Sequence, residues 1–247
     1  MGTAKFAPMA GQFDGALWPL INQRVRSFSG QPFLTSIDAD GMRTELSGVT
    51  VLNAVAKNAG ALVDEGDLEP GSTVAMHLPW HWQRITWTLA AWTIGAVVIP
   101  SGDVTSANLV ITDRVTASTL TDADEPWVVS LHPLGLVEAG LPSSVVDATG
   151  LSRMQPDALL VEPASGDGLA LELEGMSYSR SEALQWAGSS IPSTSDRVLL
   201  NAPAIDALSA WFIPTLFPLL GSGAVVMTHT SDASVIARQE GITAIWQ

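Results

Sequence analysis

Short apolar runs alternate with amphipathic segments along the chain, and this alternation predicts its secondary structure. Between Val49 and Asp64, apolar residues recur at helical spacing, and Ser47 precedes them as a residue able to cap a helix. From Leu169 to Leu173, leucine alternates with alanine and glutamate, which is typical of a half-buried strand. Ser179 and Glu182 have the spacing of a capping box, which predicts that a further helix begins there.

The remaining elements continue the same order. We expect helices over residues 15–26, 82–92, 207–220 and 231–239, and strands over 32–37, 43–46, 73–78, 97–99, 108–112, 127–131, 158–162, 197–201, 224–227 and 242–246. The pattern weakens between about residues 139 and 156, which predicts an irregular connection. Alternating strands and helices predict a single α/β domain over residues 1–247, with a mostly parallel sheet or sheets and helices on both faces.

One uncharged segment, from Ala207 to Thr228, has the length of a membrane span. Pro214, Pro218, Gly221 and Gly223 divide it, so the pattern favours a buried helix, a turn and a strand. The N-terminus has no apolar run of signal-peptide length. We therefore expect a cytoplasmic protein that is not inserted in a membrane.

The charge and the composition restrict the partners. The formal net charge is −14, from 25 acidic and 11 basic residues among 247, and Lys and Arg form no cluster. Nucleic acids and anionic membranes attract positive patches, so we expect neither as a partner. Cysteine is absent, which excludes disulfides, thiolate metal ligands and a cysteine nucleophile. Hydrophobic residues make up 47% of the chain, enough for a sizeable core.

Familiar catalytic and metal-binding motifs are missing. His77 and His81 are four residues apart, but Pro79 lies between them at a strand-to-helix turn, so the spacing favours a structural or surface role over metal binding. The chain contains no G-x-S-x-G hydrolase motif and no Walker motif, and the glycines at 166 and 168 lack the third glycine of a dinucleotide fingerprint.

The tryptophans offer a second candidate for a binding site. Trp82, Trp87 and Trp92 lie in one predicted helix, where their spacing of five distributes them around the helix axis. This spacing favours core packing. Trp80 follows a proline at a strand end, and we expect it at the rim of a pocket.

Several motifs occur in the order found in adenylate-forming enzymes. They are Thr44-Glu45-Leu46, Glu69-Pro70-Gly71, Leu78-Pro79, Gly95-Ala96 through Pro100, DRVLLNAP at 196–203 and PLLGSGAVVM at 218–227. The chain thus resembles the N-terminal part of the superfamily of acyl-CoA synthetases, luciferases and peptide-synthetase adenylation domains. Within that superfamily it is most similar to a short, uncharacterised subfamily. The resemblance implies the α/β fold of the N-terminal subdomain of these enzymes.

The resemblance also implies the position of a phosphate-binding loop. The family motif T-S-G-T-T-G-x-P-K-G corresponds to the stretch beginning Ala164-Ser165-Gly166, so Ser165, Gly166, Asp167 and Gly168 are the candidate cofactor-binding residues. The threonines, the proline and the lysine of that motif are absent here. A phosphate loop needs inward N–H groups, hydroxyls and a cation.

Acidic residues occupy this stretch instead. Asp167, Glu172 and Glu174 would each repel a triphosphate by about 4 kcal/mol at ~4 Å and an effective dielectric constant near 20. An Asp-Gly turn between two strands accounts for Asp167-Gly168 without a ligand. We therefore expect no cofactor. The alternative is that ATP or AMP binds with Mg²⁺, which these charges disfavour.

Other family features also have no counterpart. The only lysines are Lys5 and Lys57, neither near a matching motif, and the family's Y-G-x-T-E segment, ribose-binding aspartate and C-terminal lid would follow Gln247. We therefore expect a non-catalytic binding or interaction module, for an acyl or nucleotide-like molecule or for itself. Its exposed apolar faces would be covered in a homo-oligomer or by a protein partner.

Two alternatives stay open. One is residual AMP, ATP or acyl binding, with adenylate-forming activity only if a second chain supplies the lid. The other is an unrelated α/β enzyme that uses Asp103, Asp113 or Asp206 at the strand ends.

Overall fold

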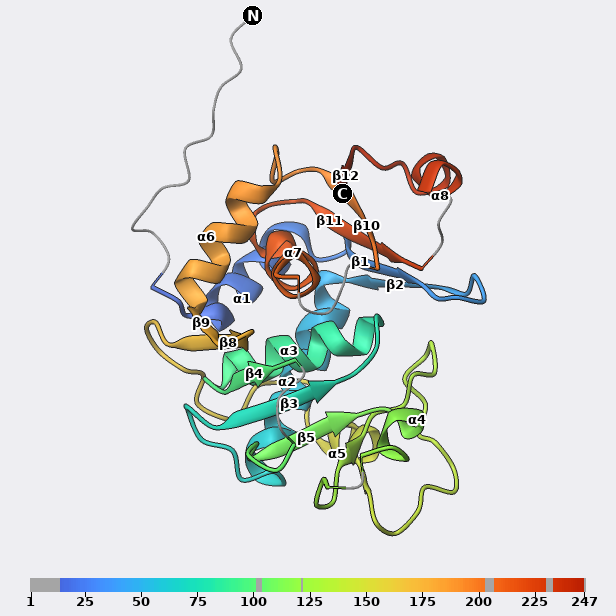
Figure 1. Cartoon of the computed structure of the whole chain (residues 1–247). Coiled ribbons are helices and arrows are strands. Elements are labelled where there is room, and N and C mark those ends of the chain that lie inside the picture. Colours follow the sequence, from blue (N-terminus) through green and yellow to red (C-terminus); the bar gives the residue numbers. More distant parts are fainter. Residues whose placement is uncertain (1–13, 101–103, 121, 203–206, 230–232, 247) are drawn as a thin grey trace, which may run out of the picture.

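The structure, a computed structural model, describes residues 14–100, 104–120, 122–202, 207–229 and 233–246 (Figure 1). One of its two sheets has five strands in the order β12-β10-β11-β1-β2. Only β1 and β2 pair antiparallel in this sheet. The strands are β1 (Pro32–Ile37), β2 (Arg43–Ser47), β10 (Arg197–Asn201), β11 (Ala224–Thr228) and β12 (Ala244–Trp246).

The other sheet has seven strands in the order β7-β6-β5-β3-β4-β8-β9. Its strands are parallel except for the β8–β9 hairpin. They are β3 (Thr73–His77), β4 (Val97–Ile99), β5 (Leu109–Thr112), β6 (Trp127–Val128), β7 (Val146–Asp147), β8 (Leu169–Leu173) and β9 (Met176–Ser179). Two mostly parallel sheets with helices packed on them confirm the predicted α/β class.

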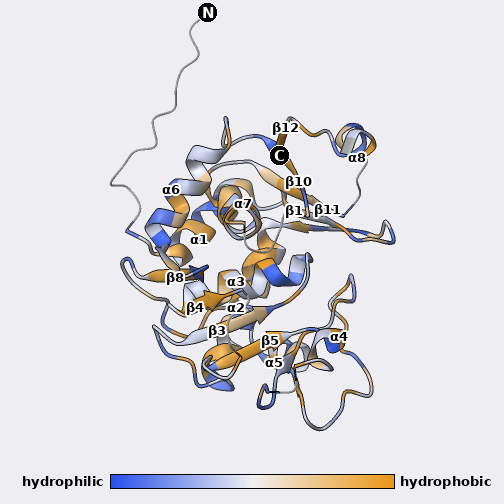
Figure 2. Cartoon of the chain, viewed as in Figure 1, coloured by the Kyte–Doolittle hydropathy of each residue, from blue (hydrophilic) through white to orange (hydrophobic). Residues whose placement is uncertain are grey.

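A layer of helices lies between the sheets (Figure 1). It contains α1 (Leu17–Phe28), α2 (Gly48–Asp64), α3 (Trp82–Thr93), α6 (Arg180–Ser190) and α7 (Ser209–Leu216), which continues as the 3₁₀ helix η1 (Phe217–Leu220). Every residue of α3 is buried, so this helix lies at the centre of the core. Figure 2 shows hydrophobic stretches on α7 and on the strands β4, β5 and β8. The predicted packing role of Trp87 and Trp92 is confirmed, since each is 1% exposed.

Three shorter helices lie outside this layer: α4 (Arg114–Ala117), α5 (Ala148–Met154) and α8 (Ala233–Gln239). Ile236 of α8 packs against Leu199 and Val226, whereas the alternate strand residues Val198 and Val225 face the main core. Helix α8 therefore covers the outer face of the five-stranded sheet.

Local capping signals predicted helix starts accurately. Ser47 Oγ accepts a hydrogen bond from the N–H of Thr50 at 3.3 Å, which caps α2. Ser179 and Glu182 form the predicted capping box, with the Glu182 N–H donating to Ser179 Oγ at 3.2 Å and the Ser179 N–H donating to Glu182 Oε2 at 2.8 Å. The chain reverses between β8 and β9 at Glu174 and Gly175, whose φ angles are 51° and 76°.

Two predictions about the middle of the chain are wrong. Residues 158–162 form no strand, and Leu160 is 79% exposed. Conversely, β7 and α5 form inside the segment predicted to be irregular. Asp147 allows this helix because its carboxylate accepts the N–H of Gly150 at 2.9 Å and caps α5.

The uncharged segment from Ala207 to Thr228 is divided into a helix, a turn and a strand, as its proline and glycine positions predict. It forms α7, η1 and β11, which are largely buried in the core. Across the described ranges, no helix combines the length and the apolar character that a membrane crossing requires.

A network of four charged side chains joins β2 and β10 to the end of α8. Glu240 accepts hydrogen bonds from Arg43 Nε at 2.6 Å and from Arg197 Nη2 at 2.6 Å, and its side chain is 9% exposed. Glu45 accepts from the same two arginines. The hydrogen bond from Arg43 is the main reason why the pKa of Glu240 lies below its usual value.

Replacing Glu240 with glutamine is therefore expected to lower the free energy of unfolding by about 1–2 kcal/mol at pH 7, because its three charge-assisted hydrogen bonds from Arg43 and Arg197 weaken. The depressed pKa makes this contribution present above about pH 4.3, the unfolded value, and it is lost as the pH falls through the folded pKa. Urea unfolding at pH 7 and at pH 3 measures both effects. Glu69→Gln, at an exposed position, is the matched control, and an equal loss at both pH values would contradict the charge-based account.

Candidate functional site

The segment Ala164–Gly168, here called the loop 164–168, precedes β8 and lies against the beginnings of α1 and α6. The N–H of Ala164 donates to the Thr93 carbonyl at the end of α3, at 2.8 Å. Gly166 has a φ of +68°, in the region that favours glycine. The predicted Asp-Gly turn between two strands is wrong, because residues 158–162 are not a strand and the hairpin turn lies at Glu174–Gly175.

The Asp167 carboxylate occupies the beginning of α6. It accepts the backbone N–H of Ser181 at 3.0 Å, the Ser181 hydroxyl, and the N–H of Gly168 at 2.9 Å. Desolvation raises the pKa of Asp167, but the hydrogen bonds from Ser181 and Gly168 outweigh it and hold the pKa below its usual value. A negative charge is therefore already present where the first-turn N–H groups and the helix dipole favour an anion.

Arg180 also binds the loop 164–168, through hydrogen bonds to its carbonyl groups. Its side chain is buried, and it donates from Nε to the Gly15 carbonyl at 2.9 Å and from Nη2 to the Gly166 carbonyl at 2.8 Å. Its backbone N–H donates to the Gly168 carbonyl at 2.8 Å. A Cβ on Gly168 would lie only 3.1 Å from Arg180 Nη2, closer than an ordinary contact, so the close approach of Arg180 favours a glycine at this position. The candidate residues Ser165–Gly168 thus form a loop closed by groups of the protein.

Of the two histidines predicted to be structural, His77 ends β3 and His81 precedes α3. His81 Nδ1 accepts the N–H of Gln83 at 3.3 Å and caps the helix, while His229 Nε2 lies 2.9 Å from the Trp80 carbonyl oxygen. Burial lowers the pKa of His81 to about 4, with opposing effects from Asp38 and His229, so the ring is neutral at pH 7. Within the described ranges no three His, Asp or Glu residues are placed to hold a metal ion.

The other residues proposed from sequence are placed as follows. Trp80 is buried and stacks over Arg84, so it is not the rim residue that was predicted. Asp113 caps α4 by accepting the N–H groups of Val115 and Thr116 at 2.8 and 3.2 Å. Asp103 and Asp206 lie outside the described residues.

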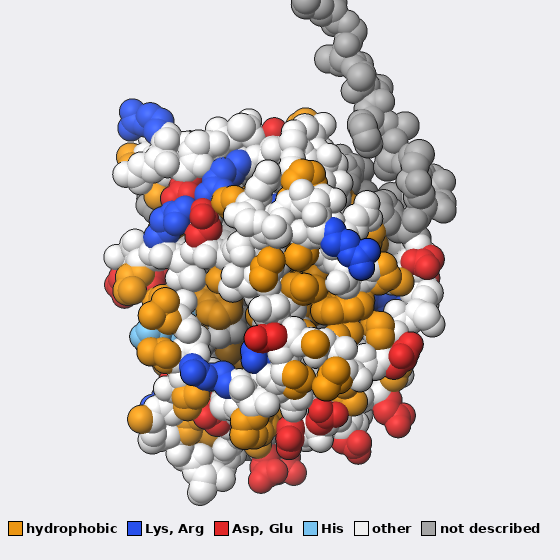
Figure 3. Space-filling model, turned by 180° about the vertical axis from the view of Figure 1, so that it is seen from behind, with side chains coloured by type: hydrophobic (Ala, Val, Ile, Leu, Met, Phe, Trp, Pro, Cys, Tyr) orange, Lys and Arg blue, Asp and Glu red, His pale blue; other side chains and the backbone are white. Residues whose placement is uncertain are grey.

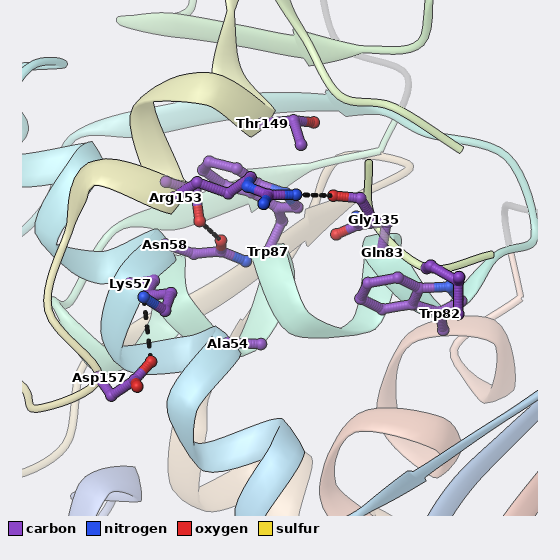
Figure 4. A pocket seen from close by; sticks show the side chains of 12 residues that line it. Ala54, Lys57, Asn58, Trp82, Gln83, Trp87, Gly135, Thr149, Arg153 and Asp157 are labelled. Carbon is purple, nitrogen blue, oxygen red and sulfur yellow. Dashed lines mark hydrogen bonds and ion pairs between the residues drawn. The ribbon is translucent and has the colours of Figure 1, made fainter. Parts of the chain in front are cut away.

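A cavity of about 440 Å³ opens between α2, α3 and α5 (Figure 4). Its lining residues come from these helices, from a connecting loop and from Asp157: Ala54, Lys57, Asn58, Trp82, Gln83, Trp87, Leu134, Gly135, Thr149, Ser152, Arg153 and Asp157. Seen from behind, this side of the molecule is hollowed, with hydrophobic side chains on the floor of the hollow (Figure 3). We call this space the α2–α3–α5 cavity.

Hydrogen bonds order the inner wall of the α2–α3–α5 cavity. Asn58 accepts from the Ser152 hydroxyl at 2.6 Å, and Thr149 Oγ1 accepts the N–H of Ser130 at 2.8 Å. The helices that carry Asn58 and Gln83 were predicted from the sequence, but α5 was not, so the cavity that these helices line together could not be foreseen.

No family model matches the chain. A curated relative from Mycobacterium tuberculosis, named "TIGR03089 family protein", is 36% identical over 138 residues, which cover 54% of this chain and 57% of the relative. The chain thus aligns with little more than half of the curated relative that it matches.

Solved structures give a fuller match to the fold. An acyl-CoA synthetase from Brucella canis superposes with a TM-score of 0.71 at 20% identity, over 92% of this chain and 46% of the enzyme. A fatty acyl-CoA synthetase from Mycobacterium tuberculosis gives a TM-score of 0.67 at 14% identity, over 94% of this chain and 49% of the enzyme. The expected resemblance is confirmed for the fold: this chain has the architecture of part of an acyl-CoA synthetase, about half its length.

Proposed function

We propose that this protein is a binding module built on the acyl-CoA synthetase fold, and that its loop 164–168 holds no nucleotide phosphate. The observation that carries this proposal is the Asp167 carboxylate on the Ser181 N–H and hydroxyl at the start of α6. In the resemblance described above, this stretch corresponds to the loop that binds ATP phosphates.

Electrostatics supports the proposal. A phosphate at the start of α6 would compete with Asp167 for the same N–H group, and the two negative charges would repel each other. Two donors of Arg180, the nearby cation, already bind the carbonyls of Gly15 and Gly166. A triphosphate would have to break these bonds before it could use the loop.

The alternative function is residual binding of AMP, ATP or an acyl compound, with adenylate-forming activity only when another chain supplies a lid. It predicts that the loop opens on binding, with Asp167 released from Ser181. Nucleotide affinity therefore distinguishes the two functions.

We expect calorimetric titration of the full chain with ATP and Mg²⁺ to give a Kd weaker than about 1 mM, or less than ~4 kcal/mol of binding free energy. AMP and an acyl-CoA, titrated in parallel, separate phosphate recognition from recognition of the base or the acyl group. Tight ATP binding that Ser165→Ala weakens would sink the proposal and establish the alternative. Glu174→Gln, on the distant hairpin turn, serves as the control for a changed surface charge.

A further inference from the structure

We propose that the α2–α3–α5 cavity binds a small anion with a flat apolar body, such as an aromatic carboxylate. This inference rests on the proposed binding function and names a site and a ligand class for it. The cavity shares no lining residue with the loop 164–168, so the ATP titration and the experiment below can fail independently.

The first argument is the Gln83 side chain. Gln83 is 6% exposed, and its amide end is directed into the cavity beside Gly135 (Figure 4). No residue of the described ranges hydrogen-bonds to this amide. The Gln83 amide is open to solvent through the cavity, so a polar group of a ligand can bind it in place of water.

The second argument is the aromatic wall. Trp82 and Trp87 come from α3, where Trp87 is 1% exposed and meets Trp127 edge to face with ring centroids 6.3 Å apart. Packing of this kind fixes the Trp87 indole behind the cavity wall, and Trp82, which is 8% exposed, provides the apolar surface that a ligand can reach. Such a surface suits a flat ligand, and about 440 Å³ lies within the range of small-molecule sites.

The third argument is the sign of the charge. Lys57 Nζ pairs with Asp157 at 3.0 Å and donates to the Gln155 carbonyl at 2.8 Å. Arg153 donates a hydrogen bond to the Gly135 carbonyl at 3.4 Å and forms no ion pair within the described residues. The lining therefore carries two positive charges against one negative charge, within a chain whose net charge is −14. A local excess of positive charge favours an anionic ligand.

The Gln83 amide, the tryptophan wall and the positive charge would bind different parts of one ligand. The Gln83 amide and Arg153 provide donors for a carboxylate, and the tryptophans provide a surface for a planar body. In Figure 4, the Lys57–Asp157 pair lies on the opposite side of the cavity from Gln83, which leaves Arg153 as the cation nearest to the Gln83 side. A neutral ligand of the same shape would use the wall but not the charge.

The test is a titration of the full chain with benzoate and with benzamide, followed by calorimetry and by tryptophan fluorescence. We expect benzoate to bind at least tenfold more tightly than benzamide. Arg153→Gln is expected to weaken benzoate binding at least tenfold, and Gln83→Leu at least threefold. Arg114→Gln makes the same charge change at an exposed arginine outside the cavity and is expected to leave the affinity unchanged.

Each other outcome overturns part or all of the proposal. Absence of benzoate binding would mean that the cavity holds only water. Binding that Arg153→Gln and Gln83→Leu both leave within twofold would place the ligand elsewhere. If benzamide bound as tightly as benzoate, the negative charge of the ligand would play no part in recognition. Should Gln83→Leu fail to fold, the exposed Arg153→Gln variant still decides the result.

Discussion

Arg84→Met is expected to leave the free energy of unfolding unchanged or to raise it, whereas Arg84→Ala is expected to lower it by about 3 kcal/mol. Arg84 is 2% exposed on α3, and no carboxylate of the described residues pairs with it. Its Nη2 donates to the Ala210 carbonyl at 3.0 Å, while its Nε is buried without a partner. Burial lowers the pKa of Arg84 to about 9, so the guanidinium is still charged at neutral pH.

Two aromatic rings offset part of the cost of this buried charge. The Arg84 guanidinium lies 4.8 Å from the ring centroid of Trp80 and 4.6 Å from that of Trp211. A desolvated cation–π contact contributes about 2 kcal/mol, which is less than the cost of burying an unpaired ion. Methionine fills a similar space without the charge and also packs well on aromatic rings. Alanine leaves a cavity instead, which explains its opposite effect.

Arg24 provides the matched control because it is also 2% exposed. Its guanidinium donates to the carbonyls of Pro218 at 3.0 Å, Phe28 at 2.9 Å and Pro32 at 3.1 Å. Arg24→Met would leave these buried and partly buried carbonyls without their donor and is expected to cost about 3 kcal/mol. Guanidinium chloride unfolding of the three variants measures the contrast. If Arg84→Met were as damaging as Arg24→Met, the Arg84 charge would stabilise the fold, which would contradict this prediction.

Elements specified by nearby residues could be predicted from the sequence. The helix that begins after Ser47 and the one that begins after Ser179 need only a cap and an apolar face, and both signals lie within the segment itself. Residues 158–162 contain an apolar run of strand length, but a strand also needs a neighbouring strand with a free edge. Leu159 and Val161 instead pack against the core from an irregular segment.

The candidate sites depend on contacts that the sequence does not display. Arg180 reaches the Gly15 carbonyl across 165 positions, and Ser152 reaches Asn58 across 94. The family motif indicates the position of the loop 164–168 and its unsuitable charge. It did not show that Asp167 binds the beginning of α6, because the acceptor and the donor come from different elements. Secondary structure was therefore more predictable than the sites.

Arg180→Ala is the second variant with a large expected effect, a loss of about 3 kcal/mol in the free energy of unfolding. The Arg180 guanidinium is buried, and it holds the Gly15 and Gly166 carbonyls. Its removal leaves a cavity and two acceptors without their donor. The loop 164–168 would then lose its attachment to the beginning of α1, and protease cleavage near Ser165 is expected to become faster.

Asp167→Asn tests the other attachment of the same loop. It is expected to cost about 1 kcal/mol at pH 7, because a neutral side chain interacts less well with the first turn of α6. The pKa of Asp167 is depressed in the folded state, so its contribution is present above the unfolded pKa, about 3.9. The difference between wild type and Asp167→Asn should therefore shrink as the pH falls below about 4.

The double variant decides whether the two side chains act on one loop. If Arg180 and Asp167 hold the same closed conformation, the loss in Arg180→Ala/Asp167→Asn should be smaller than the sum of the single losses by at least about 0.5 kcal/mol. Urea unfolding of the four proteins gives this coupling energy, with Glu174→Gln as the control for removing one exposed carboxylate. Strict additivity would mean that the loop has two independent attachments. A nucleotide could then displace Asp167 without disturbing Arg180, and the electrostatic case against phosphate binding would rest on Asp167 alone.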